Sequence, residues 1–423
     1  MIIKPAKRTE SVQEYYFSAK LKEIASMNAE RAASGKESVI NLGIGSPDGM
    51  PPAGAIEALC ETARQSGSHA YQSYVGIPQL RKAFADWYGK WYGVTLCPDN
   101  EIQPLVGSKE GILLVSLAFL DKGDKVLVPD PGYPTYSSAS RLAEAEIVTY
   151  DLREDNGWQP DFDALEKTDL EGVKIMWTNY PNMPTGAPAT EELYDRLVDF
   201  GRRHGIMICN DNPYSFIMND RPLSILARAG AKECCLELNS LSKAHNMAGW
   251  RIGMAAAAPD VISQILKVKS QMDSGMFRPL QIAAVEALGQ ETEWFKVLND
   301  EYRVRRKLAE DIFGLLGVSF DHSAEGMFLW GKISRLPSVA RNDKKASVAG
   351  GDNEGCHFER SPQGEVEKSM GEALSDRLLY DCGVFITPGF IFGKNGRDYV
   401  RISLCAKPEI LSMAYDRIKR LIG

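Results

Sequence analysis

Lys243 is a lysine in a setting that could make its amine reactive. It follows an apolar run within the segment Ser240–Gly253, among serine and small side chains, and Arg251 lies eight positions later. Lysine is rarely buried unless it is paired, so a solvated amine in a polar loop is the plainest interpretation. The functional interpretation is a partly desolvated amine. Its leading use is Schiff-base chemistry with a carbonyl cofactor.

A carboxylate and a phenol follow another apolar run. Asp211 and Tyr214 come just after the run Ile206–Cys209. In an open α/β sheet, ligands bind beyond the carboxyl ends of the strands. There, Asp211 could hold the proton of a pyridinium nitrogen, and Tyr214 could reach a phenolic oxygen. The alternative for Asp211 is a helix N-cap.

A third segment could bind an anion. Small residues in Val106–Gly111 precede the apolar run Ile112–Leu120. At a helix start, exposed backbone N–H groups and the helix dipole favour a negative charge. The segment therefore suggests a phosphate site, with an ordinary helix cap as the alternative.

The elements that must position these residues alternate between about 100 and 260. Short apolar runs rich in β-branched residues alternate with longer amphipathic stretches, which is typical of a parallel sheet. Strands that are apolar on both faces need helices on both sides, so we expect a doubly wound, mainly parallel α/β domain. The expected strands are Lys125–Pro129, Val173–Thr178, Gly205–Asn210, Cys234–Asn239 and Trp250–Ala256, with helices such as Gly111–Leu120 and Thr190–His204 between them.

Beyond residue 260 the pattern changes to long helical periodicity through Glu291–Leu316. A smaller α+β region follows, with expected strands in Met327–Ile333 and Gly383–Pro388. We expect an N-terminal arm and part of the small domain in residues 1–45, a large cofactor-binding domain in 46–300 and a small C-terminal domain in 301–423. The polar segment 334–370 is predicted to be a surface loop or insertion.

Composition excludes several classes of protein. The 423 residues are 44% hydrophobic and 25% charged, which is typical of a globular chain. A net charge of -7 without a basic patch argues against nucleic-acid binding. The eight cysteines form no CxxC and no metal-ligand spacing with the five histidines, so we expect no metal. Without a signal-peptide stretch or an apolar run of ~20 residues, a cytoplasmic protein without membrane contact is expected.

Taken in order, the motifs resemble those of the fold-type I pyridoxal-phosphate aminotransferases, the family of aspartate, aromatic and LL-diaminopimelate aminotransferases. The resemblance covers nearly the whole chain. Besides the segments above, it rests on the motifs Asn41–Asp48, Tyr71–Arg81, Asp130–Pro134, Pro181–Gly186 and Val400–Ser403.

The resemblance implies roles around pyridoxal 5′-phosphate. Lys243 would form the Schiff base and then move a proton as base and acid in turn. Asp211 would pair with the protonated ring nitrogen, which keeps the ring an electron sink. Tyr214 would bond to the ring's 3′ oxygen and Tyr133 would stack on its face, although both tyrosines could simply be half-buried aromatics.

The resemblance also implies how the phosphate and the substrate are held. The phosphate would lie against Gly107, Ser108, Lys109, Ser240, Ser242 and Arg251, with Tyr71 reaching it from the other subunit of a homodimer. Arg401 would grip the substrate carboxylate with its two-pronged guanidinium, and Gly45 would let the backbone approach it. Arg278 could bind a distal carboxylate, although a solvated arginine is the commoner case.

One position departs from the family pattern. Relatives carry Asn immediately before Pro-Thr-Gly, whereas this chain has Met183 there. A thioether donates no hydrogen bond. Either Asn182 or Asn179 takes over through a shifted loop, with Asn182 the assigned cofactor-binding residue, or Tyr214 alone holds the 3′ oxygen.

These observations predict an aminotransferase that moves an amino group between an L-amino acid and a 2-oxo acid, with 2-oxoglutarate and glutamate as one pair. The same fold hosts other reactions. A β-elimination lyase acting on carbon–sulfur bonds is the alternative, and a cofactor-sensing regulatory module is a more distant one.

Overall fold

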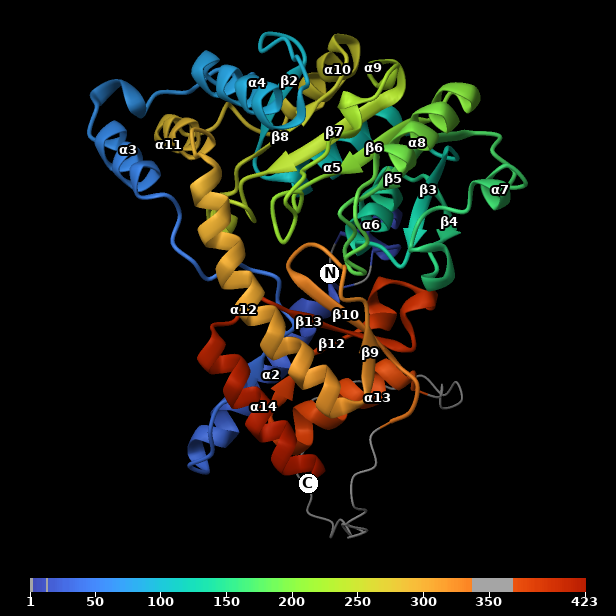
Figure 1. Cartoon of the computed structure of the whole chain (residues 1–423). Coiled ribbons are helices and arrows are strands. Elements are labelled where there is room, and N and C mark those ends of the chain that lie inside the picture. The colour runs from blue at the N-terminus through green and yellow to red at the C-terminus, as the bar shows by residue number, and fades with distance from the viewer. Residues whose placement is uncertain (1–2, 13, 337–367) are drawn as a thin grey trace.

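The computed structural model describes residues 3–12, 14–336 and 368–423. A seven-stranded sheet with helices on both faces forms the upper part of the molecule in Figure 1, and a smaller antiparallel sheet with its own helices forms the lower part. The helix α12 (Thr292–Leu316) runs from one part to the other. Most of the segment 334–370, predicted as a polar insertion, lies outside the described residues.

The large sheet has the strand order β2-β8-β7-β6-β5-β3-β4. Only β8 is antiparallel to its neighbours β2 and β7, so the sheet is mainly parallel, as predicted. Its strands are β2 (Ile102–Leu105), β3 (Lys125–Asp130), β4 (Glu146–Asp151), β5 (Val173–Thr178), β6 (Met207–Asp211), β7 (Cys235–Ser240) and β8 (Gly253–Ala256).

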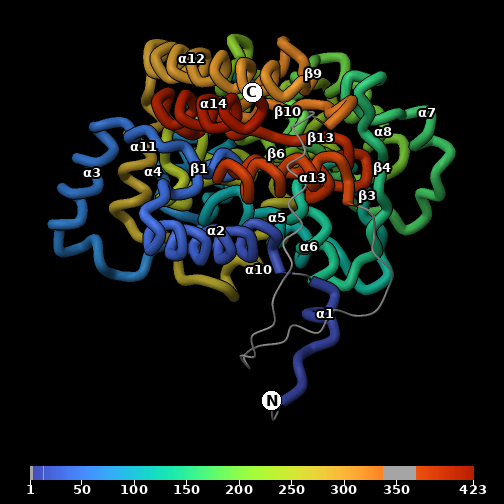
Figure 2. Tube along the Cα trace, turned by 90° about the horizontal axis from the view of Figure 1, so that it is seen from below, coloured from blue at the N-terminus to red at the C-terminus, as the bar shows by residue number. Residues whose placement is uncertain are grey.

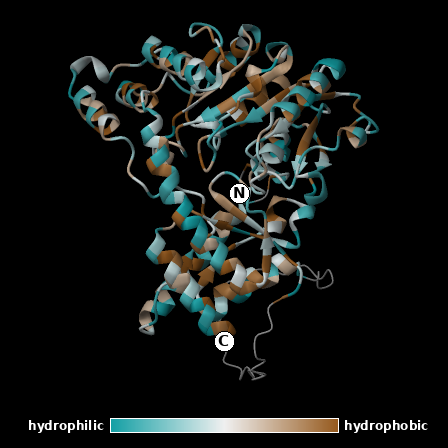
Figure 3. Ribbon diagram, viewed as in Figure 1, coloured by the Kyte–Doolittle hydropathy of each residue, from teal (hydrophilic) through white to brown (hydrophobic). Residues whose placement is uncertain are grey.

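Both faces of this sheet are covered because the central strands carry apolar side chains on both sides. The helices α5 (Ser108–Phe119), α6 (Pro134–Leu142) and α10 (Pro259–Lys269) pack on one face. The helix α8 (Glu191–His204) packs on the other, through Leu197 among others. Apolar residues run along the central strands and polar residues lie on the outer helices in Figure 3.

Helix ends follow local sequence signals. The Thr190 hydroxyl accepts a hydrogen bond from the Leu193 amide at the start of α8, and Gly205 ends that helix with a φ of 65°. Gly107, with a φ of 78°, precedes α5. These signals fix where β6 and α5 begin, and so position the residues expected to do chemistry.

The lower part contains a four-stranded sheet of order β12-β13-β10-β9. Its strands are β9 (Val318–Phe320), β10 (Phe328–Ile333), β12 (Thr387–Pro388) and β13 (Tyr399–Ser403). Helices α13 (Met370–Arg377) and α14 (Pro408–Ile422) pack beside it. The remaining helices are α1 (Lys7–Glu10), α2 (Tyr16–Ala33), α3 (Ala53–Ala63), α4 (Pro78–Tyr92), α7 (Phe162–Leu165), α9 (Ala231–Cys234) and α11 (Arg278–Leu288).

The N-terminal segment returns to this lower part. Strand β1 (Ile40–Asn41) pairs in parallel with β11 (Val384–Phe385), and Arg417 donates a hydrogen bond of 2.8 Å to the Ser38 carbonyl. Helix α2 lies next to α13, where Lys20 is 3.8 Å from Asp376 (Figure 2). The arm thereby passes from the C-terminal elements toward the large sheet. None of the described helices is long and apolar enough to cross a membrane.

Candidate active site

A cavity of about 390 Å³ lies at the carboxyl edge of the large sheet. Helix α2, the start of α5, the end of β6, the β7–β8 loop and β13 all contribute side chains to it. It brings together most of the residues that the sequence analysis singled out. These lining residues are Gly45, Ser108, Lys109, Tyr133, Asp211, Tyr214, Ser240, Ser242, Lys243, Arg251 and Arg401.

The amine of Lys243 projects into this cavity. Its Nζ donates a hydrogen bond of 2.6 Å to the Gly45 carbonyl. Burial lowers the pKa of the amine below its ordinary value, and the nearby positive charges of Arg401 and Arg251 lower it further. A lysine with a lowered pKa is more readily neutral, which suits it to attack a carbonyl or to accept a proton. The interpretation of Lys243 as a solvated loop residue is therefore wrong.

Asp211 ends β6 and lies at the inner side of the cavity. The Tyr136 hydroxyl donates a 3.1 Å hydrogen bond to Oδ2, whereas Oδ1 has no hydrogen-bond partner among the described residues. Burial raises the pKa of the carboxyl to about 7, although the hydrogen bond from Tyr136 and the nearby Ser108 hydroxyl oppose this shift. No helix begins at Asp211, so the helix-cap alternative does not apply. A buried acceptor without a partner suits a protonated ring nitrogen.

The start of α5 meets three side chains that suit a phosphate. The Ser240 hydroxyl donates to Ser242 Oγ at 2.8 Å, and Arg251 Nη1 donates to the same oxygen at 3.2 Å. A Cβ at Gly107 would overlap the Arg251 guanidinium as it stands, and the φ of 78° at this position also favours glycine. The N-terminus of a twelve-residue helix, two hydroxyls and a guanidinium together form an anion site.

Arg401 is a buried cation whose partners are mostly aromatic rings. Only 3% of its surface is exposed. Its Cζ lies 4.0 Å from the ring centre of Phe328, 4.7 Å from that of Phe392 and 5.7 Å from that of Phe17. Nη2 donates to the Gly43 carbonyl at 2.8 Å, and Nε has no partner among the described residues.

The surroundings of Arg401 therefore suit a carboxylate ligand. Burial lowers the pKa of the guanidinium to about 10, which reflects the cost of a buried charge that has no acidic counter-ion among the described residues. A Cβ at Gly45 would overlap the Phe328 ring, so the main chain at this position lies unusually close to the rings beside Arg401. A carboxylate bound here would satisfy the free guanidinium donors in a bidentate manner.

Two tyrosines complete the cavity. Tyr133 precedes α6, and its ring centre lies 5.6 Å from that of Tyr136 in an edge-on arrangement. The Tyr214 ring centre is 6.0 Å from Lys243 Nζ. Both positions suit contacts with a flat ring between Asp211 and Lys243. Tyr136 was missed by the sequence analysis, although it follows Tyr133 by three residues and so lies on the same side of α6.

Other predicted residues lie outside the cavity of their own chain. The Tyr71 side chain is 91% exposed. Arg278 donates to Gln65 Oε1 at 2.9 Å and to Ser68 Oγ at 3.2 Å. Gly107 borders the anion site through its contact with Arg251 but does not line the cavity itself.

The structure of the loop at Met183 shows where Asn179 and Asn182, the two candidates to replace the missing asparagine, place their side chains. Asn182 points into the loop: its Oδ1 accepts from the Thr185 hydroxyl at 2.7 Å, and its Nδ2 donates to the Asn179 carbonyl at 3.1 Å. It does not line the cavity, so the assignment of Asn182 to a cofactor contact is not supported by its position. Asn179 does line the cavity, but its amide bonds to the Asp211 carbonyl and the Met183 amide. The Met183 sulfur accepts a hydrogen bond of 3.2 Å from Arg401.

No group of three or more potential metal ligands was found among the described residues. The arrangement fits a phosphorylated, nitrogen-containing ring: an anion site, an acceptor for a ring N–H, and a reactive amine between them. The described residues leave Asp211 Oδ1 and Arg401 Nε unsatisfied on the two sides that such a ring and a carboxylate would occupy.

The chain is similar to known proteins over nearly its whole length. Residues 37–418 match the family described as aminotransferase class I and II. The LL-diaminopimelate aminotransferase of Dehalococcoides mccartyi is 36% identical over 411 residues, which cover 97% of this chain and 96% of that protein. Substrate-bound BacF from Bacillus subtilis superposes with a TM-score of 0.85 at 33% identity, covering 100% of this chain and 98% of that chain. The fold also matches Thermus thermophilus aspartate aminotransferase, with a TM-score of 0.83 at 24% identity over 99% and 100% of the two chains.

Proposed function

This chain belongs to the class I and II aminotransferase family and is an aminotransferase; we propose that it works with pyridoxal 5′-phosphate. It moves an amino group between an L-amino acid and a 2-oxo acid in two half-reactions, and 2-oxoglutarate and glutamate form one of the pairs. One observation carries the proposal: the amine of Lys243 shares its cavity with a carboxylate oxygen of Asp211 and a guanidinium nitrogen of Arg401, neither of which has a partner in the described part of the chain.

The cofactor supplies a carbonyl carbon and an electron-withdrawing ring when it is bound. The chain's own residues supply the rest. Asp211 holds a proton at the ring nitrogen, and the pairing lowers the raised pKa of its carboxyl, because an adjacent positive charge favours the ionised form. Ser108, Ser240, Ser242 and Arg251 hold the phosphate through charge-assisted and backbone hydrogen bonds.

Lys243 moves the proton between the substrate's α-carbon and the cofactor. Its pKa is lowered by burial, so the amine is available as a base without a large energetic cost. Arg401 binds the substrate's α-carboxylate, which fixes the α-carbon near Lys243. The rings of Phe17, Phe328 and Phe392 exclude water from this ion pair, which strengthens it.

The active unit is a homodimer in this proposal. Tyr71 is a large aromatic side chain that its own subunit leaves almost fully exposed, so it is free to contact a partner subunit. Its position in the family motif is the one from which a second subunit reaches the phosphate. Two shared sites per dimer follow from a two-fold axis.

The test is product analysis with the purified protein loaded with cofactor. Formation of glutamate from 2-oxoglutarate in equal amount to the 2-oxo acid derived from the donor supports the proposal. The carbon–sulfur lyase alternative predicts pyruvate and ammonia from cysteine conjugates without any 2-oxo acid acceptor. Because the similar curated protein is named for LL-diaminopimelate, that amino acid belongs in the donor panel with acidic, aromatic and aliphatic donors.

A further inference from the structure

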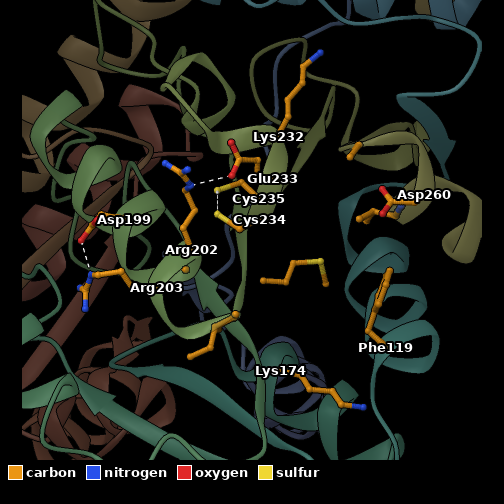
Figure 4. A pocket seen from close by; sticks show the side chains of 16 residues that line it. Phe119, Lys174, Asp199, Arg202, Arg203, Lys232, Glu233, Cys234, Cys235 and Asp260 are labelled. Carbon is orange, nitrogen blue, oxygen red and sulfur yellow. Dashed lines mark hydrogen bonds and ion pairs between the residues drawn. The ribbon is translucent and has the colours of Figure 1, made fainter.

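Two consecutive cysteines lie at the opposite end of the large sheet from the active-site cavity. Cys234 ends the helix α9 and Cys235 begins the strand β7, and both line a groove at the amino ends of β5, β6 and β7 (Figure 4). Ser240, which lines the active-site cavity, is at the other end of β7, about 17 Å away along an extended strand. The two thiols are therefore remote from the cavity that a second subunit would complete.

The sulfur atoms of this pair are close together. Successive side chains of a strand point to opposite faces of the sheet, but the change from helix to strand between these two residues brings both sulfurs to the groove. The two Sγ atoms are 3.8 Å apart, and the Cys234 thiol donates to the Val198 carbonyl at 3.6 Å. Neither cysteine is in a disulfide. Bonded sulfurs are about 2 Å apart, so a short movement of the side chains would join them.

The two thiols have different surroundings. Cys234 is half-buried, whereas Cys235 is only 2% exposed. The hydrogen bond with Cys235 lowers the pKa of the Cys234 thiol below its ordinary value; burial and Glu233 oppose this shift, and the positive charge of Arg202 adds to it. The same hydrogen bond and burial raise the pKa of Cys235. Cys234 is thus the thiol that solvent reaches and that ionises first, and the thiolate is the nucleophilic form.

We propose that Cys234 and Cys235 form a redox modification site, in which a hydroperoxide oxidises Cys234 and Cys235 then resolves the product to a disulfide. In the first step the Cys234 sulfur attacks a peroxide oxygen, the O–O bond breaks, and a sulfenic acid forms with release of an alcohol or water. In the second step the Cys235 sulfur attacks the Cys234 sulfur. The S–O bond breaks, the S–S bond forms, and the Cys235 proton leaves with the hydroxyl group as water. The two sulfurs together lose two electrons, which reduce the peroxide.

The pair is better suited to reversible oxidation than to holding a metal ion. Thiolates also bind soft metal ions, but no group of three or more potential metal ligands occurs in the part of the chain that the structure describes. The Cα atoms of consecutive residues are about 3.8 Å apart, closer than the usual separation of about 4.4–6.8 Å in disulfides. The disulfide is therefore expected to be strained, and strained disulfides are readily reduced by other thiols.

The experiment treats the reduced holoenzyme with hydrogen peroxide, alkylates the remaining thiols and analyses tryptic peptides by mass spectrometry. Trypsin releases residues 233–243, which contain this pair and no other cysteine. The peptide is expected to lose two hydrogen atoms and both alkylation sites at least about tenfold faster than Cys60 or Cys97 is oxidised, although these two are exposed. Reduced glutathione should restore both thiols.

Two variants separate the roles of the thiols. Cys235→Ser should prevent the disulfide and leave on Cys234 a sulfenic acid that dimedone traps, whereas Cys234→Ser should give neither product in this peptide. Cys97→Ser is the matched control, because it removes an exposed thiol outside the pair, and it should leave the rate of disulfide formation unchanged. The measurement on the parent protein needs no substitution, so the test stays valid if a serine at the buried position 235 impairs folding.

Two results would overturn the inference. One is that both thiols of the pair are still alkylated after a peroxide treatment that oxidises Cys60 and Cys97. The other is an equal yield of trapped sulfenic acid in the parent and in Cys235→Ser, which would show that Cys235 does not resolve it. Neither result bears on the proposed transamination, because the pair lines the groove and not the active-site cavity.

Discussion

The large sheet has a hollow at the amino ends of its strands and another at the carboxyl ends. The two hollows differ in whether their charged groups have partners. At the amino ends of β5, β6 and β7 lies a groove of about 810 Å³, larger than the 390 Å³ cavity at the carboxyl ends. Figure 4 shows the side chains of this groove, among them the neighbouring sulfurs of Cys234 and Cys235, 3.8 Å apart.

Most charged side chains of the groove are in ion pairs. Arg202 Nε lies 2.9 Å from Glu233, Arg203 Nε lies 2.7 Å from Asp199, and Lys232 Nζ lies 2.8 Å from Glu101. In the smaller cavity, Asp211 Oδ1 and Arg401 Nε have no described partner. A protein pays for unsatisfied buried polar groups in stability. Of these two hollows, the smaller one, which bears this cost, is therefore the better candidate for catalytic chemistry.

The largest expected effect concerns Lys243, at the carboxyl edge. Lys243→Ala should reduce transamination by more than about 10⁴-fold, because the variant loses its proton-transferring amine. Its fold should persist, since the amine makes one hydrogen bond, to Gly45. Initial rates of glutamate formation, with circular dichroism as the folding control, check this. Near-normal activity in a folded variant would show that the cavity at the carboxyl ends of the strands is not the active site.

Asp211→Asn should reduce turnover by two or more orders of magnitude, because the amide holds no negative charge to stabilise a protonated ring nitrogen. A residue with a purely structural role would change the melting temperature and leave kcat alone. Steady-state kcat at saturating cofactor separates these outcomes.

The same variant tests the cost of the unpaired carboxylate in cofactor-free protein. The pKa of Asp211 is raised from 3.8 to about 7 by burial, so the folded protein binds more protons than the unfolded chain between these values. Stability should therefore fall as pH rises from about 4 to about 7, by at most about 4 kcal/mol. Asp211→Asn should flatten this dependence and be the more stable protein at pH 8. Urea melts of both proteins at pH 5 and pH 8 measure the free energy of unfolding. The same pH dependence in both proteins would contradict a raised pKa of Asp211.

The sequence predicted the central strands well, because parallel strands buried on both faces are continuously apolar. Val173–Thr178 has the predicted bounds, and Cys234–Asn239 is shifted by one residue. Strands β2 and β4 were not predicted. They lie at the sheet edges, and β4 is half-exposed, which leaves a weaker apolar signal.

The sequence predicted those residues of the candidate site that belong to a recognisable motif. Lys243, Asp211 and Arg401 meet in one cavity although they come from separate parts of the chain. Tyr136 and Phe17 were missed because their roles depend on how helices α6 and α2 are placed, which no local pattern records. Asn182 was assigned to the cofactor because it lies one position before the asparagine of the family pattern. The loop instead uses its amide to bind Thr185.

Tyr71 tests whether the carboxyl-edge cavity is completed by a second subunit. Tyr71→Ala should lower kcat/KM about tenfold or more, through a lost phosphate contact. Mixed with Lys243→Ala, it should restore about a quarter of the parent activity: half of the dimers are then mixed, and each has one intact site. Activity is measured after subunit exchange verified by mass spectrometry. No recovery, or a monomer in gel filtration, would refute shared sites.

Met183→Asn should produce a smaller change. An amide beside Arg401 adds a donor near the cofactor's 3′ oxygen, which favours the deprotonated chromophore and lowers the pH midpoint of its absorbance by about 0.7 unit, equivalent to about 1 kcal/mol. Asn182→Ala should leave the midpoint unchanged, because its side chain bonds within the loop. Spectral pH titrations of the two variants decide. A shift in Asn182→Ala instead would show that this asparagine does reach the cofactor.

The smallest effect is expected in the amino-edge groove, and it is the sharpest check of the comparison because the same substitution can be made at both edges. Arg202 and Glu233 form an ion pair with side chains 52% and 63% exposed, so Arg202→Ala should cost about 0.2–1 kcal/mol of stability and leave kcat/KM within twofold. Arg401→Ala should act chiefly on substrate binding: it removes the buried guanidinium that faces the substrate site and raises KM for the amino acid about 100-fold or more, as expected for a lost charge-assisted carboxylate contact. Urea melts give the change in the free energy of unfolding for each variant, and steady-state kinetics give the change in its turnover and KM. If Arg202→Ala impaired turnover as much as Arg401→Ala, the paired charges of the groove would have a catalytic role, and the rule that chemistry lies at the unsatisfied edge would fail for this protein.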